Sequence, residues 1–371
     1  MPDRSGQKLT GVISASVLLR QTEAVCRRAP DVVLGLSGGV DSGVAAELLV
    51  RQGYSVCGAL LRIPGADCPR EDALAVAQAA DIPLFELDVG EAFERIVLRN
   101  FAREYAGART PNPCIVCNPG VKFAALCELA DELGAPFVAS GHYAGVRTEA
   151  GRAELLRHAS GKDQSYMLYR LPQSQLGRLL LPLQQMGKAS VRELAREWAL
   201  PVAQKRDSQD ICFVPQGDYA AVLERLGVPM APGDFVDGEG RVLGRHEGIA
   251  RYTVGQRKGL GVSADRRLFV TKIDALTRRV TLQGSEALLC SRLALSDVVW
   301  TSGEAPKQPV CATVKLRLGP REHAARVQPL GERGALVLFD RPVRRGAPGQ
   351  SAVFYDGDMV LGGGVIDDAA L

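Results

Sequence analysis

Four features are missing from this sequence, and each absence excludes a class of protein or site. No apolar run approaches the ~20 residues that a membrane-spanning helix needs, and no clear small-residue cleavage site follows the short apolar run at residues 12–19. No Gly-Lys-Ser/Thr occurs, which excludes a Walker A loop. No second C-x-x-C or H-x-x-x-H accompanies the single C-x-x-C, which argues against a zinc knuckle. We therefore expect a cytosolic protein without a membrane segment.

Length, cysteine count and net charge limit the number of domains, the chemistry and the kind of partner. At 371 residues the chain is longer than a typical domain, so two or three domains are expected. Its nine cysteines, in a cytosolic chain, indicate metal, cluster or sulfur chemistry more than a disulfide framework. Residues 241–371 hold 20 Lys and Arg against 13 Asp and Glu, a net charge of +7, and the preceding residues carry −4. This basic part suits a polyanionic partner, although a solvated basic face gives the same count.

The chain is organised around a glycine-rich turn between a strand-like run and a helix-like run. The turn reads Gly35-Leu36-Ser37-Gly38-Gly39-Val40-Asp41-Ser42. In a strand–turn–helix unit, backbone N–H groups and a helix N-terminus converge on a phosphate. Ser37 and Ser42 add hydroxyl donors, and Asp41 can hold a metal ion or cap the helix. The turn resembles the pyrophosphate loop of ATP-pyrophosphatases, S-G-G-x-D-S, which implies cleavage of ATP between its α- and β-phosphates.

Strands and helices alternate after this point. The pattern predicts strands at residues 32–36, 55–61, 84–89 and 137–140, and helices at residues 42–52, 69–80, 91–106 and 120–133. Such alternation predicts a doubly wound α/β domain with a parallel sheet covered on both faces. Ligands of these sheets bind at the carboxyl ends of the strands. Leu61, which ends the second strand, and Gly141 and His142, which follow the fourth, are therefore expected beside the nucleotide.

The stretch at residues 107–119 contains three prolines, which predict a loop and exclude a helix. Within it Cys114 and Cys117 form the C-x-x-C pair. Zinc is disfavoured because no second ligand pair exists. A redox or persulfide-handling pair fits, and so does one side of an iron–sulfur cluster completed by a third cysteine. Both of these alternatives stay open on the residues alone.

Two polar stretches come later in the chain. Residues 162–166 read Lys-Asp-Gln-Ser-Tyr and predict a short helix with Asp163 as a possible N-cap. Residues 205–213 read Lys-Arg-Asp-Ser-Gln-Asp-Ile-Cys-Phe. The basic neighbours predict a lowered pKa for Cys212, and hence a reactive thiolate.

The C-terminal part has the pattern of an all-β structure. Short β-rich runs separated by Gly and Pro turns occupy residues 268–273, 280–283, 310–316, 334–339 and 350–355. Runs of this length and spacing predict a β-barrel that begins near residue 280. The excess of Lys and Arg over Asp and Glu also falls in this part of the chain, as the binding of a polyanion requires.

Taken together, these motifs resemble the tRNA-specific 2-thiouridylases (the MnmA/TrmU family of the ATP-pyrophosphatase superfamily). The matching stretches cover nearly the whole chain in the family's order: residues 37–42, 110–113, 117–118, 141–143, 162–166, 207–213, 252–261, 348–350 and 362–364. The resemblance implies an ATP-pyrophosphatase domain at residues 1–215, a central domain at residues 216–279 and a tRNA-binding β-barrel at residues 280–371.

The resemblance also implies a reaction and its site residues. ATP, with Mg²⁺, adenylates the C2 oxygen of the wobble uridine, and sulfur then displaces AMP. The ATP contacts carried over are Gly35, Leu36, Ser37, Gly38, Gly39, Val40, Asp41, Ser42, Leu61 and Gly141. The residues that line the target base are Asn112, Pro113 and Cys114. The residues that contact tRNA are His142, Lys162, Asp163, Gln164, Arg317, Leu318 and Gln350.

For the sulfur step, Cys212 resembles the residue that accepts sulfur as a persulfide, and Cys117 the one that releases it by forming a disulfide. The chain departs from the family pattern at Cys114, where many members have an aspartate proposed as the acid/base group. Cys114, Cys117 and Cys212 could instead hold a [4Fe–4S] cluster with one iron left open. A second departure is Leu318, where the family usually has an aromatic residue. Both sulfur mechanisms remain open.

Partners follow from the resemblance as well. The substrates implied are the tRNAs for Lys, Glu and Gln, and the sulfur source is a donor protein, either a cysteine desulfurase or a persulfide relay. A monomer is expected, or a dimer if a cluster is present. Another ATP-pyrophosphatase ligase acting on a small molecule would share residues 37–42 but has no need of the three cysteines. A non-catalytic tRNA-binding protein would not need the phosphate loop.

Overall fold

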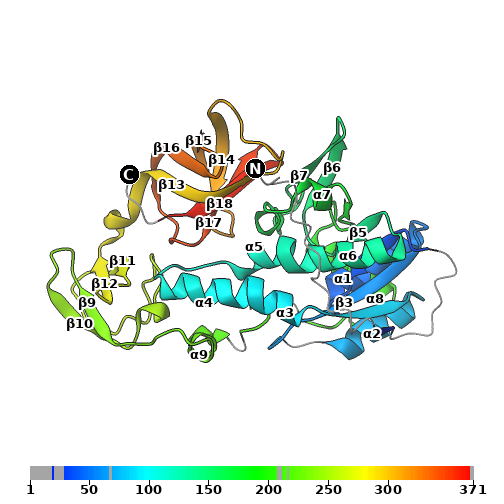
Figure 1. Ribbon diagram of the computed structural model, residues 1–371, viewed down its shortest axis with the longest axis horizontal. Coiled ribbons are helices and arrows are strands. Elements are labelled where there is room, and N and C mark those ends of the chain that lie inside the picture. The colour runs from blue at the N-terminus through cyan, green and yellow to red at the C-terminus, as the bar shows by residue number, and fades with distance from the viewer. Residues whose placement is uncertain (1–18, 21–28, 67–68, 207–210, 215–216, 368–371) are drawn as a thin grey trace, which may run out of the picture. The chain divides into compact units, whose positions relative to one another are not determined.

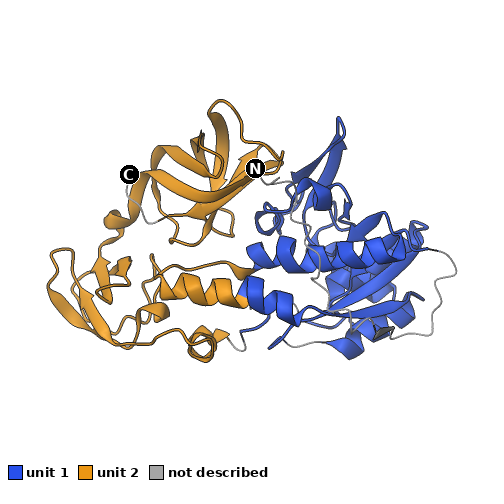
Figure 2. Cartoon of the chain, in the orientation of Figure 1, with its two compact units in different colours: residues 1–97, 114–215 blue, residues 98–113, 216–371 orange. Residues whose placement is uncertain are grey.

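The computed structural model of the chain (Figure 1) describes residues 19–20, 29–66, 69–206, 211–214 and 217–367. Within these ranges the chain divides into two compact units, coloured separately in Figure 2. Unit 1 comprises residues 1–97 and 114–215, and unit 2 comprises residues 98–113 and 216–371. Residues 207–210, which belong to the motif before Cys212, lie outside the described residues.

A six-stranded sheet forms the centre of unit 1, in the order β1-β4-β3-β2-β5-β8. Its strands are β1 Leu19–Arg20, β2 Val32–Gly35, β3 Val56–Arg62, β4 Leu84–Asp88, β5 Phe137–Ala139 and β8 Leu179–Leu180. All neighbours are parallel except β1, which is antiparallel to β4. The chain runs from β2 out to β3 and β4, then returns to place β5 on the other side of β2. In doubly wound sheets ligands bind in the crevice at such a reversal, here outside the carboxyl ends of β2 and β5.

Helices cover both faces of this sheet. Successive residues of β2 point to opposite faces, so each face can be identified by the helices that its side chains meet. Val32 and Leu34 share a core cluster with side chains of α1, α2 and α8. A side chain at Gly35 would instead meet Leu126 of α6, which packs on β2 and β5. These helices are α1 Val40–Arg51, α2 Arg70–Ala79, α6 Phe123–Leu133 and α8 Lys188–Glu197. The predicted doubly wound domain is confirmed.

Smaller elements complete unit 1. They are α3 Gly90–Phe93, the π-helical η1 Glu94–Leu98, the hairpin β6 Gly145–Glu149 with β7 Arg152–Leu156, the 3₁₀ turn η3 Ser165–Met167 and α7 Gln173–Leu176. The η3 turn is the short helix expected near residue 163. Its N-cap is Gln164, one residue after Asp163, whose carboxylate accepts a hydrogen bond of 3.0 Å from the Ser165 N–H.

The prediction that prolines exclude a helix before residue 119 is wrong. A continuous helix runs through α5 Pro113–Cys117, the π-helical η2 Asn118–Lys122 and α6. Pro113 occupies the first helical position, where an N–H has no intrahelical partner to lose. Pro119 lies in the π-helical turn, the form in which a helix absorbs a break in its hydrogen-bond ladder. Gln175 Nε2 donates a hydrogen bond of 2.9 Å to the Pro119 carbonyl.

This helix, Pro113–Leu133, is 21 residues long and apolar enough to cross a membrane by length and composition. However, 61% of its most apolar window is buried inside the protein. It packs on β2 and β5 as the helix that covers one face of the sheet. Its apolar character is therefore explained by the core of unit 1.

Unit 2 contains a small four-stranded sheet in the order β10-β9-β12-β11. The strands are β9 Gly233–Val236, β10 Val242–His246, β11 Phe269–Asp274 and β12 Arg279–Gln283. Its core includes Phe235, Val254, Leu260 and Val270. The helices of this unit are α4 Arg99–Ala106, α9 Tyr219–Arg225 and the 3₁₀ turns η5 Ile249–Arg251 and η6 Ser285–Leu288.

The rest of unit 2 is a closed antiparallel barrel of six strands with its own core. The strand order is β13-β16-β15-β14-β17-β18, and β13 pairs with β18 to close it. The strands are β13 Leu289–Trp300, β14 Val310–Lys315, β15 His323–Leu330, β16 Gly334–Arg344, β17 Ser351–Asp356 and β18 Met359–Ile366. Closure leaves no unpaired strand edge.

The predicted combination of a parallel-sheet domain, a small central domain and a C-terminal barrel is confirmed. The barrel begins at Leu289, later than expected, because β11 and β12 pair within the four-stranded sheet. A boundary after residue 279 would cut through β12. Residues 98–113 also cluster with unit 2 instead of the phosphate-loop domain. The three-part boundaries themselves stay a prediction.

Candidate functional site

The glycine-rich loop joins β2 to α1 at the carboxyl edge of the sheet. Gly38 has a φ of +66°, and a Cβ there would lie 2.8 Å from Pro69 O and 3.0 Å from Ala73 N. Glycine is therefore required both for its conformation and for space. Gly39 is the N-cap of α1, and no side chain caps the first turn. The N–H groups and positive end of α1 are thus suited to a phosphate.

Two serines hold this loop in shape. Ser42 Oγ donates a hydrogen bond of 3.0 Å to Gly39 O and accepts one of 3.2 Å from the Ser37 N–H. The two hydroxyl oxygens are also 3.2 Å apart, and because the Ser42 proton is engaged, Ser37 is the donor of that contact. Ser42 is buried and Ser37 is exposed. The expected role of Ser42 as a phosphate donor therefore competes with its role inside the loop.

The carboxylate of Asp41 is held by two side chains from later in the chain. Its Oδ1 accepts a hydrogen bond of 2.7 Å from the Tyr143 hydroxyl and one of 2.6 Å from Lys188 Nζ. Lys188 is the first residue of α8, and its ammonium also lies 5.8 Å from the centroid of the Tyr143 ring. No side chain among the described residues is recorded as a donor to Asp41 Oδ2. Asp41 thus keeps one oxygen available for a cation.

Gly141 lies directly against the start of α1. A Cβ at this position would be 2.9 Å from the carbonyl carbon of Asp41 and 2.9 Å from Ser42 N. Both are backbone atoms and cannot move aside without distorting the first helical turn. The end of β5 and the phosphate loop therefore meet as the sequence predicts.

Other residues of the loop play different parts. Leu36 and Val40 are buried in the core cluster of unit 1, so only their backbone can reach a nucleotide. Leu61 is half-buried near the end of β3, and its expected contact with ATP stays a prediction. Lys205 Nζ donates a hydrogen bond of 3.0 Å to Gly38 O and forms an ion pair with Asp72. A second lysine thus stands at the phosphate loop.

Three cysteines form the other part of the site. Cys114 and Cys117 are three residues apart on α5 and share one face of it. Cys117 is buried, Cys114 is half-buried and Cys212 is exposed. The three thiols are close enough to interact: the proximity of Cys114 and Cys212 contributes to a raised pKa at Cys117. The structure therefore brings together the three cysteines that the sequence singled out.

Burial is the largest cause that raises the pKa of each of these thiols, to about 12 for Cys117. The nearby charge of Lys122 acts in the opposite direction and lowers the pKa of all three. The prediction of a lowered pKa at Cys212 is wrong. Although the residue is exposed, desolvation by the surrounding protein and the nearby Cys114 outweigh the lysine charge, so its pKa is raised.

Thiolates are the usual ligands of iron–sulfur clusters, so the donor types fit a [4Fe–4S] cluster. Their arrangement does not: within the described ranges, no three His, Cys, Asp or Glu side chains are grouped so as to hold a metal ion. The present geometry therefore supports no reaction step through a cluster.

The side chains expected to contact tRNA in unit 1 surround Tyr143. The Tyr143 N–H donates a hydrogen bond of 2.8 Å to Gln164 Oε1, and Lys162 Nζ lies 5.1 Å from the centroid of its ring. Asp163 Oδ1 accepts hydrogen bonds from the N–H groups of His158 and Ser165, at 3.2 and 3.0 Å. Gln164 and Asp163 are therefore already engaged in holding their own segment.

His142 is half-buried beside the same segment. Its Nδ1 is 2.9 Å from Ser140 Oγ, and its ring packs 5.9 Å from that of Phe123. Burial, with a smaller effect of Lys122, holds the pKa of His142 well below its usual value. The imidazole is therefore neutral at pH 7 and can offer a hydrogen bond but no charge to RNA.

In unit 2, three of the motif stretches meet at Thr110. The Thr110 N–H donates to Pro348 O at 2.7 Å, and its hydroxyl donates to Thr253 Oγ1 at 3.1 Å. Gln350 Nε2 donates a hydrogen bond of 2.8 Å to Thr110 O. Gln350, expected to contact tRNA, thus also fixes the segment that leads to Asn112 and Pro113.

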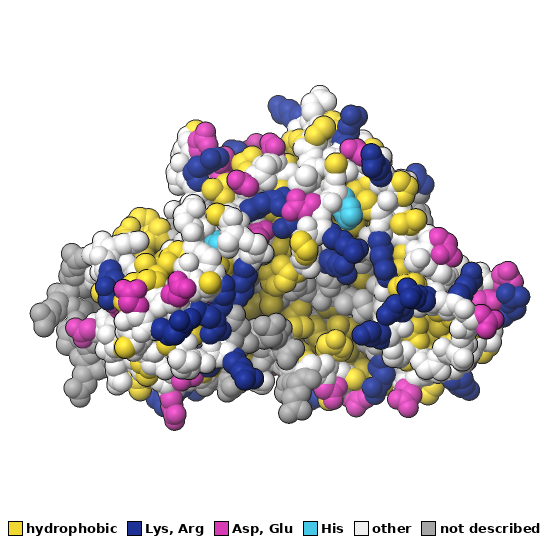
Figure 3. Space-filling view, turned by 180° about the vertical axis from the view of Figure 1, so that it is seen from behind, with side chains coloured by type: hydrophobic (Ala, Val, Ile, Leu, Met, Phe, Trp, Pro, Cys, Tyr) yellow, Lys and Arg dark blue, Asp and Glu magenta, His cyan; other side chains and the backbone are white. Residues whose placement is uncertain are grey.

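Arg317 and Leu318 follow β14 in the barrel, and both are exposed. Leu318 is 48% exposed, so this apolar side chain is in contact with solvent. Several groups of Lys and Arg side chains lie on the face shown in Figure 3. The structure thus leaves Arg317 and Leu318 accessible to a partner.

Sequence reasoning missed Lys188 and Lys122. Lys188 is the first residue of an ordinary amphipathic helix. Lys122 follows Cys117 by five residues, and the π-helical turn between them is not apparent from the sequence. Neither has a motif around it that would have identified it. Tyr143 lay within a recognised motif, but its bond to Asp41 could not be read from the sequence.

Comparisons with known proteins cover almost the whole chain. The family models that match are the tRNA methyl transferase HUP domain over residues 30–216, the tRNA methyl transferase PRC-barrel domain over residues 221–283 and the aminomethyltransferase beta-barrel domain over residues 290–366. The chain is 42% identical over 354 residues to tRNA-specific 2-thiouridylase MnmA 1 of Caldanaerobacter subterraneus subsp. tengcongensis, with 91% of this chain and 97% of that protein covered.

Two further relatives are similar to the same extent. The tRNA-specific 2-thiouridylase MnmA of Chlorobium chlorochromatii is 43% identical over 351 residues, with 91% of this chain and 98% of that protein covered. The MnmA of Clostridium acetobutylicum is 39% identical over 350 residues, with 90% and 99% covered. The likeness therefore includes both compact units.

Proposed function

Because the chain belongs to the family of tRNA-specific 2-thiouridylases, we propose that it adenylates the C2 oxygen of the wobble uridine with ATP and replaces that oxygen with sulfur. The observation that carries this proposal is that one compact unit contains both the phosphate loop and three mutually interacting thiols. An ATP-dependent ligase for a small molecule would need the first but not the second.

ATP binds at the loop between β2 and α1. The N–H groups of the Gly38–Gly39 turn and the first turn of α1 hold its phosphates. Lys188 and Lys205 supply positive charge at the same loop, since both ammonium groups already touch it. Asp41 is the residue that would hold Mg²⁺, because its Oδ2 has no recorded donor and carboxylates are preferred ligands of this ion. A Mg²⁺ ion held there would neutralise negative charge on the phosphates.

The uridine enters next to the start of α5. Asn112, Pro113 and Cys114 line the base, and the neutral thiol of Cys114 offers a proton near the C2 oxygen. The tRNA contacts His142, Lys162, Asp163, Gln164, Arg317, Leu318 and Gln350. Of these, Lys162 and Arg317 supply the charge, and the others supply hydrogen bonds or packing.

Sulfur is delivered through Cys212. A donor protein, a cysteine desulfurase or a persulfide relay, reaches this exposed residue and leaves a persulfide on it. The Cys117 thiolate attacks the Cys212 sulfur, which forms a disulfide and releases hydrosulfide toward C2. Hydrosulfide adds to C2 and AMP leaves with the former C2 oxygen. A thiol reductant then reopens the disulfide. These two roles are supported by the exposure of Cys212, which a donor protein can reach, and by the burial of Cys117, which it cannot.

The second candidate mechanism is a [4Fe–4S] cluster on Cys114, Cys117 and Cys212, which would supply an iron to carry the hydrosulfide. The mutual proximity of the three thiols favours it, and their present arrangement does not. We expect a monomer if sulfur is delivered through the Cys212 persulfide, and a dimer if a cluster is present. We infer a cytoplasmic protein that acts on the tRNAs for Lys, Glu and Gln.

Incubation of the purified protein with unmodified tRNA, ATP and a persulfide donor tests the proposal, with 2-thiouridine measured by mass spectrometry of nucleosides. AMP release should depend on tRNA, and release without tRNA would point to a small-molecule ligase. Cys117→Ala and Cys212→Ala should each abolish thiolation and leave ATP binding intact. Cys311→Ala, which removes an exposed cysteine of the barrel, is the matched control.

Iron decides between the two sulfur mechanisms. After anaerobic reconstitution, fewer than about one iron per chain would leave the relay as the mechanism. Cys114→Asp provides an independent answer, because a relay needs only Cys117 and Cys212. Retained thiolation by Cys114→Asp would contradict an obligatory cluster, and loss of both iron and activity would contradict the relay.

A further inference from the structure

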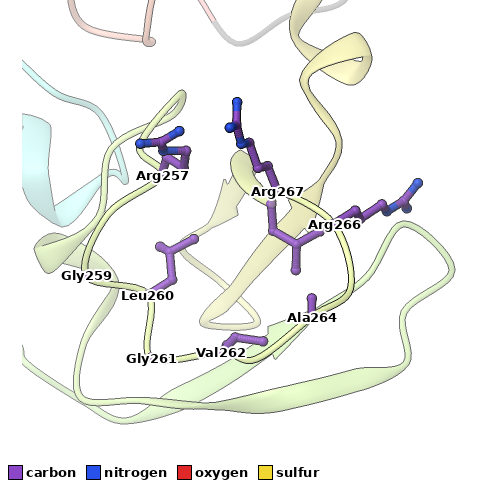
Figure 4. A pocket seen from close by; sticks show the side chains of 9 residues that line it. Arg257, Gly259, Leu260, Gly261, Val262, Ala264, Arg266 and Arg267 are labelled. Carbon is purple, nitrogen blue, oxygen red and sulfur yellow. The ribbon is translucent and has the colours of Figure 1, made fainter.

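The loop between η5 and β11 in unit 2 lines an open cavity of about 550 Å³ that no role above explains. Its lining includes Arg257, Leu260, Val262, Arg266 and Arg267. Figure 4 shows Arg257 and Arg267 rising from facing segments of the loop on the same side of the cavity, and Arg266 extending away from them. Leu260 is buried in the core beneath, so the cavity combines an apolar floor with a cationic rim.

The charges on this rim are not neutralised locally. Across the described ranges, no carboxylate forms an ion pair with any of the three arginines that line the cavity. All three side chains are exposed. By contrast, Arg241 and Arg251 of the same part of the chain each pair with an acidic residue. Uncompensated guanidinium groups around a hollow are the arrangement that binds phosphate oxygens.

The two ends of the loop that carries these arginines are held together by hydrogen bonds. Gly255, with a φ of +91°, donates its N–H to Val270 O at 2.7 Å, and the Val270 N–H donates to Gln256 O at 2.9 Å. The Gln256 side chain accepts from the Thr253 N–H at 3.0 Å. The base of the loop is therefore anchored to β11.

The loop is also joined to the barrel surface that holds Arg317. Arg344 of β16 donates a hydrogen bond of 2.8 Å to Gly255 O, and its guanidinium stacks 4.6 Å from the centroid of Phe269. Burial, together with the nearby charges of Arg317 and Arg321, lowers the pKa of Arg344. Arg344 thus contacts the base of the loop and also lies close enough to Arg317 and Arg321 to be affected by their charges.

We propose that Arg257 and Arg267 form a binding site for backbone phosphates of tRNA, with the ribose face against Leu260 and Val262. This rests on the proposed function, in which tRNA is the substrate. Free phosphate, pyrophosphate and ATP share the same chemistry. The tRNA backbone is favoured because the site is exposed and its loop contacts Arg344, which lies near Arg317.

The test compares the full-length Arg257→Ala/Arg267→Ala protein with the wild type and with Arg279→Ala. Arg279 is an exposed arginine of the same sheet that does not line the cavity, and it stands opposite Asp234 and Asp274 on the neighbouring strands. The affinity for unmodified tRNA is measured by fluorescence anisotropy over about 0.05–0.2 M salt. Thermal melting checks that all three proteins are folded.

We expect the double variant to bind tRNA about tenfold more weakly, and the slope of log affinity against log salt to fall by about two. At saturating tRNA its thiolation rate should equal that of the wild type, and its ATP affinity should be unchanged. Arg279→Ala should match the wild type throughout.

Equal tRNA affinity and salt slope in the wild type and the double variant would overturn the proposal. So would a loss of ATP or pyrophosphate binding with tRNA binding intact, which would make the cavity a nucleotide or free-anion site. Failure of the proposed function looks different: the wild type itself would then produce no 2-thiouridine, whatever the state of the two arginines.

Discussion

The hydroxyl of Tyr143 donates a hydrogen bond of 2.7 Å to Asp41 Oδ1, across 102 residues of sequence. This bond ties the segment after β5 to the first turn of α1, on the two sides of the crevice where a nucleotide binds. Tyr143 is fully buried, whereas the Asp41 carboxylate that accepts the bond is partly exposed. The bond therefore links the orientation of the phosphate loop to the segment that carries His142 and Lys162.

Tyr143→Phe removes this donor and keeps the ring. Because a hydrogen bond to a charged group is lost, we expect the free energy of unfolding to fall by about 1–2 kcal/mol. The KM for ATP should rise several-fold, since Asp41 loses one of its two anchors, while tRNA binding changes little. Chemical denaturation and steady-state kinetics measure the two effects.

Tyr105→Phe is the control for this change. Tyr105 is also buried, and burial raises its pKa to about 12, but its hydroxyl has no hydrogen bond recorded among the described residues. Its loss should leave the KM for ATP unaltered. An equal effect of both substitutions would show that loss of any buried hydroxyl, not the Asp41 bond, alters ATP binding.

Gly141→Ala tests the close approach of β5 to α1. The added methyl group would stand 2.9 Å from Ser42 N, so the first turn of α1 must shift. Overpacking of this kind costs about 1–3 kcal/mol of stability. A displaced phosphate loop should lower ATP-dependent AMP formation by about 100-fold. Gly161→Ala is matched to it, because a Cβ at Gly161 meets nothing within 4 Å. Activity within twofold of wild type for Gly141→Ala would contradict the predicted contact.

Much of the site could be predicted because local rules determine it. The strand, turn and helix around Gly38 follow from periodicity and glycine placement, and parallel strands bring their carboxyl ends to one edge. The meeting of Gly141 with the loop was therefore predictable. The bond between Tyr143 and Asp41 was not, since only the packed fold determines which hydroxyl reaches which carboxylate.

The errors have equally definite causes. Pro119 would end an α-helix, but a π-helical turn accommodates it. Cys114 and Cys117 therefore lie on a helix and not on a loop. The barrel start was misplaced because β12 alternates as a barrel strand does, and only its pairing with β9 reveals its sheet. The pKa of Cys212 was misjudged because sequence shows neighbouring charges but not the desolvation that opposes them.

The raised thiol pKa values predict slow alkylation at neutral pH. With a pKa of about 12, roughly one Cys117 in 10⁴ is ionised at pH 8, and the thiolate is the form that reacts. In metal-free protein, iodoacetamide should therefore modify the exposed Cys311 well before Cys117, as measured by peptide mass spectrometry. The Cys117 rate should rise steadily up to at least pH 10. Lys122→Gln should slow it further, because the one cation that lowers this pKa is removed. Fast modification of Cys117 at pH 7 would contradict the assignment.

The lowered pKa of His142 predicts that the free energy of unfolding decreases at mildly acidic pH. Its folded-state pKa lies well below 6.5, so the unfolded chain binds the proton first as the pH falls. The stability contribution is therefore complete above pH 6.5 and is lost below it, with a slope of up to about 1.4 kcal/mol per pH unit from this one group. Burial lowers the pKa of His246 and His323 as well, and they add to the same trend. His142→Gln should flatten the profile between about pH 5 and 6.5, where carboxylates remain ionised. Denaturation at several pH values measures it, and an unchanged slope in His142→Gln would mean that the imidazole is charged in the folded protein.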